Sequence, residues 1–173
     1  MTKFDKELLI IDGYNIINSW QELNEAMAVS LETARDKLIH IMADYSAQTG
    51  IAVLVVFDAH QVKGNHGSCE EINGIEVVFT KEGETADNYI EKVVDVIGRE
   101  YKVSVATSDW VEQQIIMGRG AFRISARELF NEVKQMILKR RADEKMMIKQ
   151  NDKLGEIIDP DIRKILEKYT NSR

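Results

Sequence analysis

Four aspartates of this chain stand where its apolar pattern changes. Asp12, Asp58 and Asp109 close the runs LLIID, VLVVFD and VSVATSD, and Asp87 opens the helical stretch TADNYIEKVVDVI. Short apolar runs between helical patterns are typical of buried parallel strands, whose carboxyl ends meet at the edge of a sheet where ligands bind. Carboxylates gathered there repel one another unless a cation or a shared proton offsets their charge. Hard divalent cations such as Mg²⁺ prefer carboxylate, water and phosphate oxygens, so the pattern indicates metal-dependent phosphodiester chemistry.

Polar residues beside these aspartates offer further oxygen atoms. Asn15 follows Asp12 in the segment DGYN, and Thr107 and Ser108 precede Asp109. An amide and two hydroxyls can contact a bound water or a phosphate. Each acid also has an ordinary interpretation as a helix cap or as part of a turn after a strand. The aspartate of VLVVFD ranks below the other three, because it can line the site without touching a metal.

Three aromatic residues lie next to the acidic motifs. Tyr14, Trp20 and Trp110 could stack on bases, although rings at strand ends also cover the core. The motifs GxGxxG and GxxxxGK[ST] are absent, so the sequence indicates no dinucleotide or P-loop site.

Length and composition predict a globular cytoplasmic protein. The 173 residues are 44% hydrophobic and 30% charged, which is enough for one domain with a core. No apolar run reaches the length of a membrane span, and MTKFDKELLI lacks the apolar core of a signal peptide. The single cysteine, Cys69, excludes an internal disulfide framework.

The charge is distributed unevenly. The net charge is −6, but residues 134–149 hold six basic side chains against two acids, so the rest of the chain carries −10. A basic strip beside an acidic site suits a nuclease, because the strip holds phosphates; the alternative is a solvated helix face. The residues expected to bind RNA are Arg119, Arg123, Lys139, Arg140, Arg141 and Lys145.

The hydrophobic periodicity predicts an α/β fold with a mostly parallel sheet. The expected strands are 8–12, 52–58, 75–80 and 103–107, with a short β-like turn around 122–124. The expected helices are a hairpin over 20–48, then 85–100, 109–118 and 126–150, and a short helix after Asp159-Pro160. Residues 59–74 are rich in glycine, asparagine and charge, and we expect them to form an irregular, mobile loop placed to fold over the site.

The segments IIDGYNII, VVFDAHQVKG, IEVVFTKEGETADNYIE and VSVATSDWVEQQIIMGRGAFRISARELF, with the basic helix beyond them, resemble the YacP-like branch of the NYN ribonucleases. This branch is a division of the PIN-like nuclease superfamily. The resemblance implies a PIN-like three-layer α/β/α sandwich with a mostly parallel central sheet and a basic C-terminal helical extension. Residues 1–130 would form the nuclease domain, and residues 131–173 the basic helix and a short C-terminal helix packed on the same domain.

The resemblance also implies an endoribonuclease that depends on Mg²⁺ or Mn²⁺ and cleaves single-stranded RNA, with mRNA and the bacterial ribosome as partners. By motif, the metal ligands fall on Asp12, Asp87 and Asp109. Asn15 occupies the asparagine position of the NYN motif, and Asp58 completes the expected catalytic set. Glu84 matches a further acidic position of the family.

A second function remains open from the sequence. In a non-catalytic RNA- or ribosome-binding adaptor with the same fold, the basic stretch 119–149 would bind and the acids would be structural. A phosphoacceptor signalling domain is disfavoured, because such domains place paired acids at the first strand and LIIDGYN holds one. The residues predict neither an RNA sequence preference nor an oligomeric state.

Overall fold

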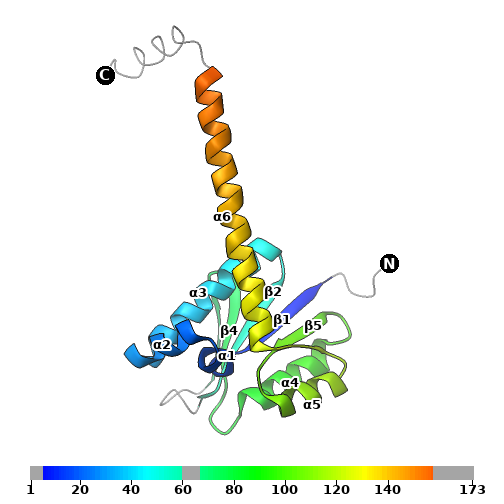
Figure 1. Cartoon of the computed structure of the whole chain (residues 1–173). Helices are drawn as coiled ribbons and strands as arrows, with labels where there is room; N and C mark the ends of the chain where they lie inside the picture. The colour runs from blue at the N-terminus through cyan, green and yellow to red at the C-terminus, as the bar shows by residue number, and fades with distance from the viewer. Residues whose placement is uncertain (1–5, 60–66, 158–173) are drawn as a thin grey trace, which may run out of the picture. The chain divides into compact units, whose positions relative to one another are not determined.

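A six-stranded sheet organises the chain, with helices on both of its faces (Figure 1). The computed structural model describes residues 6–59 and 67–157, the last seven of these by their backbone alone. The strands are β1 (Glu7–Asp12), β2 (Ala52–Phe57), β3 (Ser68–Ile72), β4 (Ile75–Phe79), β5 (Lys102–Ala106) and β6 (Phe122–Ile124). The helices are α1 (Gly13–Ser19), α2 (Gln21–Val29), α3 (Leu31–Thr49), α4 (Ala86–Ile97), α5 (Trp110–Gly118) and α6 (Ala126–Ile157).

The strand order is β3-β4-β2-β1-β5-β6, and every neighbouring pair is parallel except β3 and β4. The predicted α/β class with a mostly parallel sheet is therefore confirmed. The first strand lies in the middle of the sheet between β2 and β5, so the ends of these three strands share one edge. This order brings residues that are far apart in the sequence to the same place.

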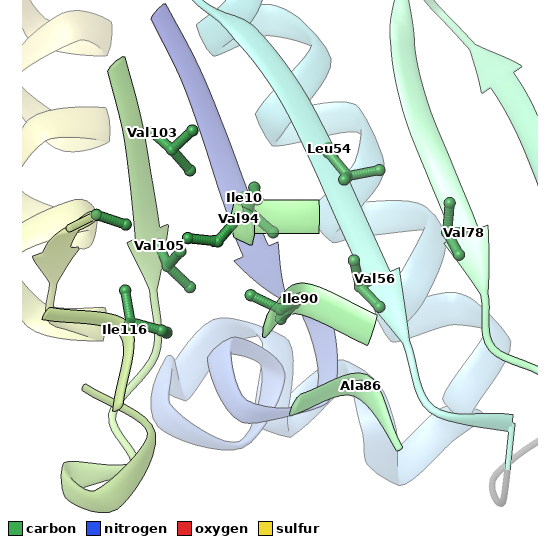
Figure 2. Packing of buried hydrophobic residues seen from close by; sticks show 11 residues of the cluster. Ile10, Leu54, Val56, Val78, Ala86, Ile90, Val94, Val103, Val105 and Ile116 are labelled. Atoms are coloured by element: carbon green, nitrogen blue, oxygen red, sulfur yellow. The ribbon is translucent and has the colours of Figure 1, made fainter. Parts of the chain in front are cut away.

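The face of the sheet that carries α4 is filled by branched apolar side chains. Val56, Val105 and Ile10 are buried and pack under Ile90 and Val94 of α4 (Figure 2). The spacing of four residues between the two α4 side chains places both on one face of that helix. The opposite face of the sheet is covered by α1 and α3. The result is the predicted three-layer arrangement, with α4 packed on the sheet through Ile90 and Val94.

Two parts of the fold differ from the prediction. The helical region begins at once with α1 at Gly13, not near residue 20. Strand β3 lies inside the segment 59–74 that was predicted to be a loop, and it forms an antiparallel hairpin with β4. Asn73 and Gly74 turn this hairpin with φ of 52° and 86°, which is the backbone that an Asn-Gly pair favours in tight β-turns. Because β3 is a polar edge strand, its composition resembles that of a loop.

The chain divides into two compact units, Met1–Val133 and Lys134–Arg173. Helix α6 passes through this division and ends at Ile157, beyond the predicted end near residue 150. The predicted helix after residue 159 and the part of the predicted loop in residues 60–66 lie outside the described residues. Among the helices in the described part, none is long and apolar enough to cross a bilayer.

Candidate metal and active site

Three carboxylates meet at the edge of the sheet. Asp12 is the last residue of β1, Asp87 is the second residue of α4, and Glu112 is the third residue of α5. One oxygen atom from each of the three lies within 4.8 Å of the other two. Two of these acids were predicted metal ligands, and the third was not. Acids from a strand end and from helix starts thus converge in the structure, and the third acid within 4.8 Å is Glu112, where the sequence had indicated Asp109.

Close backbone packing sets the position of Asp12. Its neighbour Gly13 starts α1 against the end of β2, and a Cβ atom there would lie 2.5 Å from Phe57 Cδ1 and 3.0 Å from Val56 O. The first distance is shorter than real Cβ contacts and the second is tight, so a larger residue here would have to displace the Phe57 ring and press on the backbone of β2. The glycine of the DGYN segment therefore holds Asp12 at the edge of the sheet.

Glu112 is buried, with 3% of its surface exposed. Its Oε2 accepts a hydrogen bond of 2.7 Å from the hydroxyl of Thr107, which is fully buried. Its Oε1 is also buried and accepts no hydrogen bond from an N–H or O–H donor of the described residues. A buried carboxylate oxygen without a donor is costly unless a proton or a cation compensates it. A proton shared with a neighbouring acid or a bound cation would supply that compensation.

Burial raises the pKa of all three carboxyl groups. Loss of solvent, with added repulsion from Asp12, raises the pKa of Glu112 to about 9 against the opposing bond from Thr107. Burial also raises the pKa of Asp12 to about 6, with smaller contributions from the charges of Asp87 and Asp109. Asp87 shifts in the same direction for the same principal reason. At neutral pH and without metal, Glu112 is therefore protonated and can share its proton with Asp12.

Asp109, a predicted metal ligand, lies beside the three acids but serves α5 as its N-cap. Its Oδ1 accepts hydrogen bonds from the amides of Val111 and Glu112 at 2.9 and 3.3 Å. Its charge still raises the pKa of Asp12 and Asp87, so it is close enough to add to the negative field. The structure thus gives Asp109 a positioning contact with the first turn of the helix that carries Glu112.

Asn15 links two distant parts of this edge. Its Oδ1 accepts hydrogen bonds from both the amide and the hydroxyl of Ser108, at 2.6 and 2.7 Å. The amide group is therefore engaged with the segment after β5. The predicted catalytic role of Asn15 remains a prediction, and the contact seen here is a tie between α1 and the start of α5.

The two remaining acidic candidates contact α4 in different ways. Asp58 follows β2, and its Oδ2 accepts a hydrogen bond of 3.4 Å from the amide of Ala86 at the start of α4. Glu84 forms an ion pair of 2.7 Å with Lys92 on the same helix. Neither belongs to the group of three acids that meet within 4.8 Å.

The predicted RNA-binding residues fall in both units. In the first unit, Arg119 forms ion pairs with Glu91 and Asp95, and Arg123 lies 3.7 Å from Glu128. In the second unit, α6 exposes Lys139, Arg141 and Lys145, and Arg140 lies 3.9 Å from Glu144. The two upstream arginines are thus paired with acids of the protein, whereas Lys139, Arg141 and Lys145 are exposed on α6.

The sequence prediction missed Glu112 because its position has a familiar alternative. Asp109-Trp-Val-Glu112 has the spacing of a capping box, in which an acid at the third helical position bonds back to the cap. In the structure Glu112 turns to Thr107 instead. The available signal was the segment TSDWVE itself, in which a second acid follows the strand-end aspartate within one helical turn.

The donor set fits a hard divalent cation. Three carboxylates supply oxygen atoms alone, which are the ligands that Mg²⁺ and Mn²⁺ prefer. A cation among them would also compensate the buried Oε1 of Glu112, which lacks a donor from the described residues. The described residues therefore contain an acidic cluster able to bind a metal.

Comparison with known proteins identifies the family. The model of the YacP-like NYN domain matches residues 9–171. The chain belongs to the YacP-like NYN family. It is 49% identical over 128 residues to the uncharacterized protein YacP of Bacillus subtilis, a match that covers 73% of this chain and 75% of that protein.

Solved structures of the same family share the fold. A crystal structure of Rae1 (YacP) from Bacillus subtilis is 41% identical and superposes with a TM-score of 0.69, covering 96% of this chain and 95% of that one. A mutant form of the same protein is 46% identical over 80% of this chain and 79% of that one, with a TM-score of 0.67. The predicted membership of the YacP-like NYN family and its PIN-like fold are therefore confirmed.

Proposed function

We propose that this member of the YacP-like NYN family is an endoribonuclease that uses Mg²⁺ or Mn²⁺ to cleave single-stranded RNA. The observation that carries the proposal is the meeting of Asp12, Asp87 and Glu112 around a buried carboxylate oxygen without a donor among the described residues. These three residues would hold the cation. A divalent cation there supplies positive charge that activates water for attack and stabilises the leaving oxygen.

The protein's own residues set the conditions for that chemistry. Thr107 fixes the rotamer of Glu112 through its hydroxyl, and Asp109 anchors the first turn of the helix that carries Glu112. Asp58 contacts the start of the helix that carries Asp87. Glu112 and the start of the helix that carries Asp87 are thus each held by a contact at an element boundary. Pre-organised ligands of this kind reduce the rearrangement needed for binding.

We further propose that the substrate is mRNA associated with the ribosome. The family resemblance supports this, as does the basic part of α6, where residues 134–149 carry a net charge of +4. Exposed cations bind the phosphate backbone without regard to sequence, which suits a surface that docks on RNA. The same observation supports the second candidate, a non-catalytic RNA- or ribosome-binding adaptor.

Cleavage of a labelled, unstructured RNA by the purified protein with Mg²⁺ or Mn²⁺ separates the two candidates. The nuclease account expects internal cleavage that is lost in Asp87→Asn and in Glu112→Gln but kept in the surface control Asp36→Asn. It also expects co-sedimentation with ribosomes to fall in the double variant Arg140→Gln/Arg141→Gln. If ribosome binding depends on the arginines while translated mRNA and free RNA stay intact with every metal, the adaptor is correct and the nuclease proposal fails.

A further inference from the structure

A pocket of about 490 Å³ lies within the first unit, and its lining includes Gln113, which directly follows Glu112. Its walls come from the end of α1, the segment after β5, and the start of α6, and they include Trp20, Ser108, Gln113, Arg127 and Phe130. Ligand pockets in proteins commonly have volumes of about 300–1,000 Å³. We call it the Trp20 pocket. Nothing in the proposed chemistry at the acids uses it.

An aromatic pair forms one wall of the Trp20 pocket. The rings of Trp20 and Phe130 meet edge to face, with centroids 5.6 Å apart. Trp20 is buried, and its indole Nε1 donates a hydrogen bond of 2.8 Å to Ala126 O, which fixes the ring. Phe130 is 39% exposed, so a large apolar ring is open to solvent at the pocket. Exposed rings on a rigid support are the surfaces on which unpaired RNA bases stack.

The charge of the Trp20 pocket suits a nucleotide. Its lining includes three serines, two glutamines and one arginine, and no aspartate or glutamate, although the chain as a whole is acidic. Arg127 is exposed and makes no ion pair with the described residues, unlike Arg119 and Arg123, which face acids. A cation at the rim and hydroxyl and amide groups in the wall match a phosphate and the polar edge of a base.

Hydrogen bonds connect the lining of the Trp20 pocket to residues beside the acids. Ser108 lines the pocket and donates to Asn15, which is three residues from Asp12. Gln113 lines the pocket, directly follows Glu112, and donates a hydrogen bond of 2.6 Å to Thr107 O. The lining of the pocket is therefore connected to Glu112 through Thr107 and to the first turn after Asp12 through Asn15.

We propose that the Trp20 pocket binds an unpaired RNA base next to the phosphate that is cleaved, with Phe130 as the stacking surface and Arg127 as a phosphate contact. This inference rests on the proposed function for its substrate class. It assigns these two residues to substrate binding and not to the chemical step. Their loss is expected to weaken RNA binding and leave metal binding unchanged.

The test is a titration of the ¹⁵N-labelled full chain in EDTA, where the acids cannot bind metal. The chain has two tryptophans, so two indole N–H signals are expected, and Trp110→Phe assigns them. A tetraribonucleotide should shift the Trp20 signal, and a tetramer of ribose phosphate without bases should not. Phe130→Ala should weaken binding roughly tenfold, which is the size of one stacking interaction, whereas Phe130→Tyr should restore it.

Controls separate this proposal from the nuclease proposal. Phe122→Ala removes an exposed ring of β6 outside the pocket and should bind as the unmodified chain does. Arg127→Gln should bind more weakly, with a smaller dependence of affinity on salt. An equal response to the baseless tetramer, or unchanged affinity in Phe130→Ala, overturns the base-binding proposal even if the protein cleaves RNA. Base-dependent binding without cleavage under any metal supports the pocket and overturns the nuclease proposal.

Discussion

The side-chain oxygen of Asn15 accepts two hydrogen bonds from Ser108, one from its amide and one from its hydroxyl, across 93 positions of sequence. The contact joins the first helical turn after β1 to the segment that leads into α5. Because β1 ends in Asp12 and α5 carries Glu112, this amide helps to hold two of the three clustered acids in register. The asparagine of the DGYN segment thus connects two chain segments beside the acids.

We predict that Asn15→Ala lowers the free energy of unfolding by about 0.5–1.5 kcal/mol, because two hydrogen bonds to the exposed Ser108 are exchanged for bonds to water. Asn15→Asp keeps an acceptor oxygen at the same place and should retain most of that stability. Urea unfolding monitored by circular dichroism measures both. Ser19→Ala is the matched control, since it removes a neighbouring hydroxyl and leaves the two Asn15 bonds in place. Equal stability of Asn15→Ala and the unmodified chain would contradict the assignment.

From the raised pKa values of two clustered acids, we predict that the free energy of unfolding without metal depends strongly on pH. Glu112 has a folded pKa of about 9 and Asp12 of about 6, both above the usual value near 4. Between pH 4 and its own folded pKa, each of these carboxyl groups holds a proton in the folded state that it has released in the unfolded state. The free energy of unfolding therefore falls as pH rises from about 4 to 9. Glu112→Gln removes the larger contribution, and its stability relative to the unmodified chain should increase steadily over that range.

Unfolding in EDTA at pH 5, 7 and 9 measures this difference. Added Mg²⁺ or Mn²⁺ should reverse the trend for the unmodified chain, because the cation competes with protons for the same oxygens and binds better at high pH. Glu112→Gln should respond weakly to the metal. Parallel pH profiles for the two proteins would show that Glu112 is not the buried titrating group.

Thr107 supplies a separate test of the same carboxyl. Thr107→Val removes the hydroxyl that donates to Glu112 Oε2 and accepts from the amide of Asp109. We expect a loss of about 1–3 kcal/mol, since buried partners are left unsatisfied, and weaker metal binding. Thr107→Ser keeps the hydroxyl and serves as the control. If the valine variant binds Mn²⁺ as well as the serine variant does, the threonine does not orient Glu112.

Gly13 tests the close packing that places Asp12. Gly13→Ala would put a methyl group against Phe57 and the carbonyl of Val56, and we expect a cost of about 1–3 kcal/mol together with impaired metal binding. Gly118→Ala is the matched control, because no atom lies within 4 Å of a Cβ there. Thermal unfolding of the two variants should differ by several degrees. Similar melting temperatures would show that the turn after β1 can relax without disturbing Asp12.

The parts of the fold that the sequence predicted are those that local patterns determine. Apolar runs specified the buried strands, and the glycine after α3 adopts the left-handed conformation, with φ of 74°, that ends a helix. Strand β3 was missed because a polar edge strand lacks an apolar face, although the Asn-Gly pair beside it marks a hairpin.

The site residues that the sequence predicted are likewise those that local patterns mark. Asp12 and Asp87 could be chosen because they stand where a strand ends and a helix begins. The segment TSDWVE marks Glu112 only as a second nearby acid, because its hydrogen bond with Thr107 in place of the helix cap depends on the fold around it. Hydrogen-bond partners of a side chain are decided by tertiary packing, which spacing alone does not reveal.

The most direct test of the central claim is anomalous diffraction at the manganese edge from crystals soaked in Mn²⁺ near pH 8. The account predicts a peak between the carboxylates of Asp12, Asp87 and Glu112 that disappears in Glu112→Gln crystals of the same form. Metal density elsewhere on the protein, with no peak among these three acids, would contradict it.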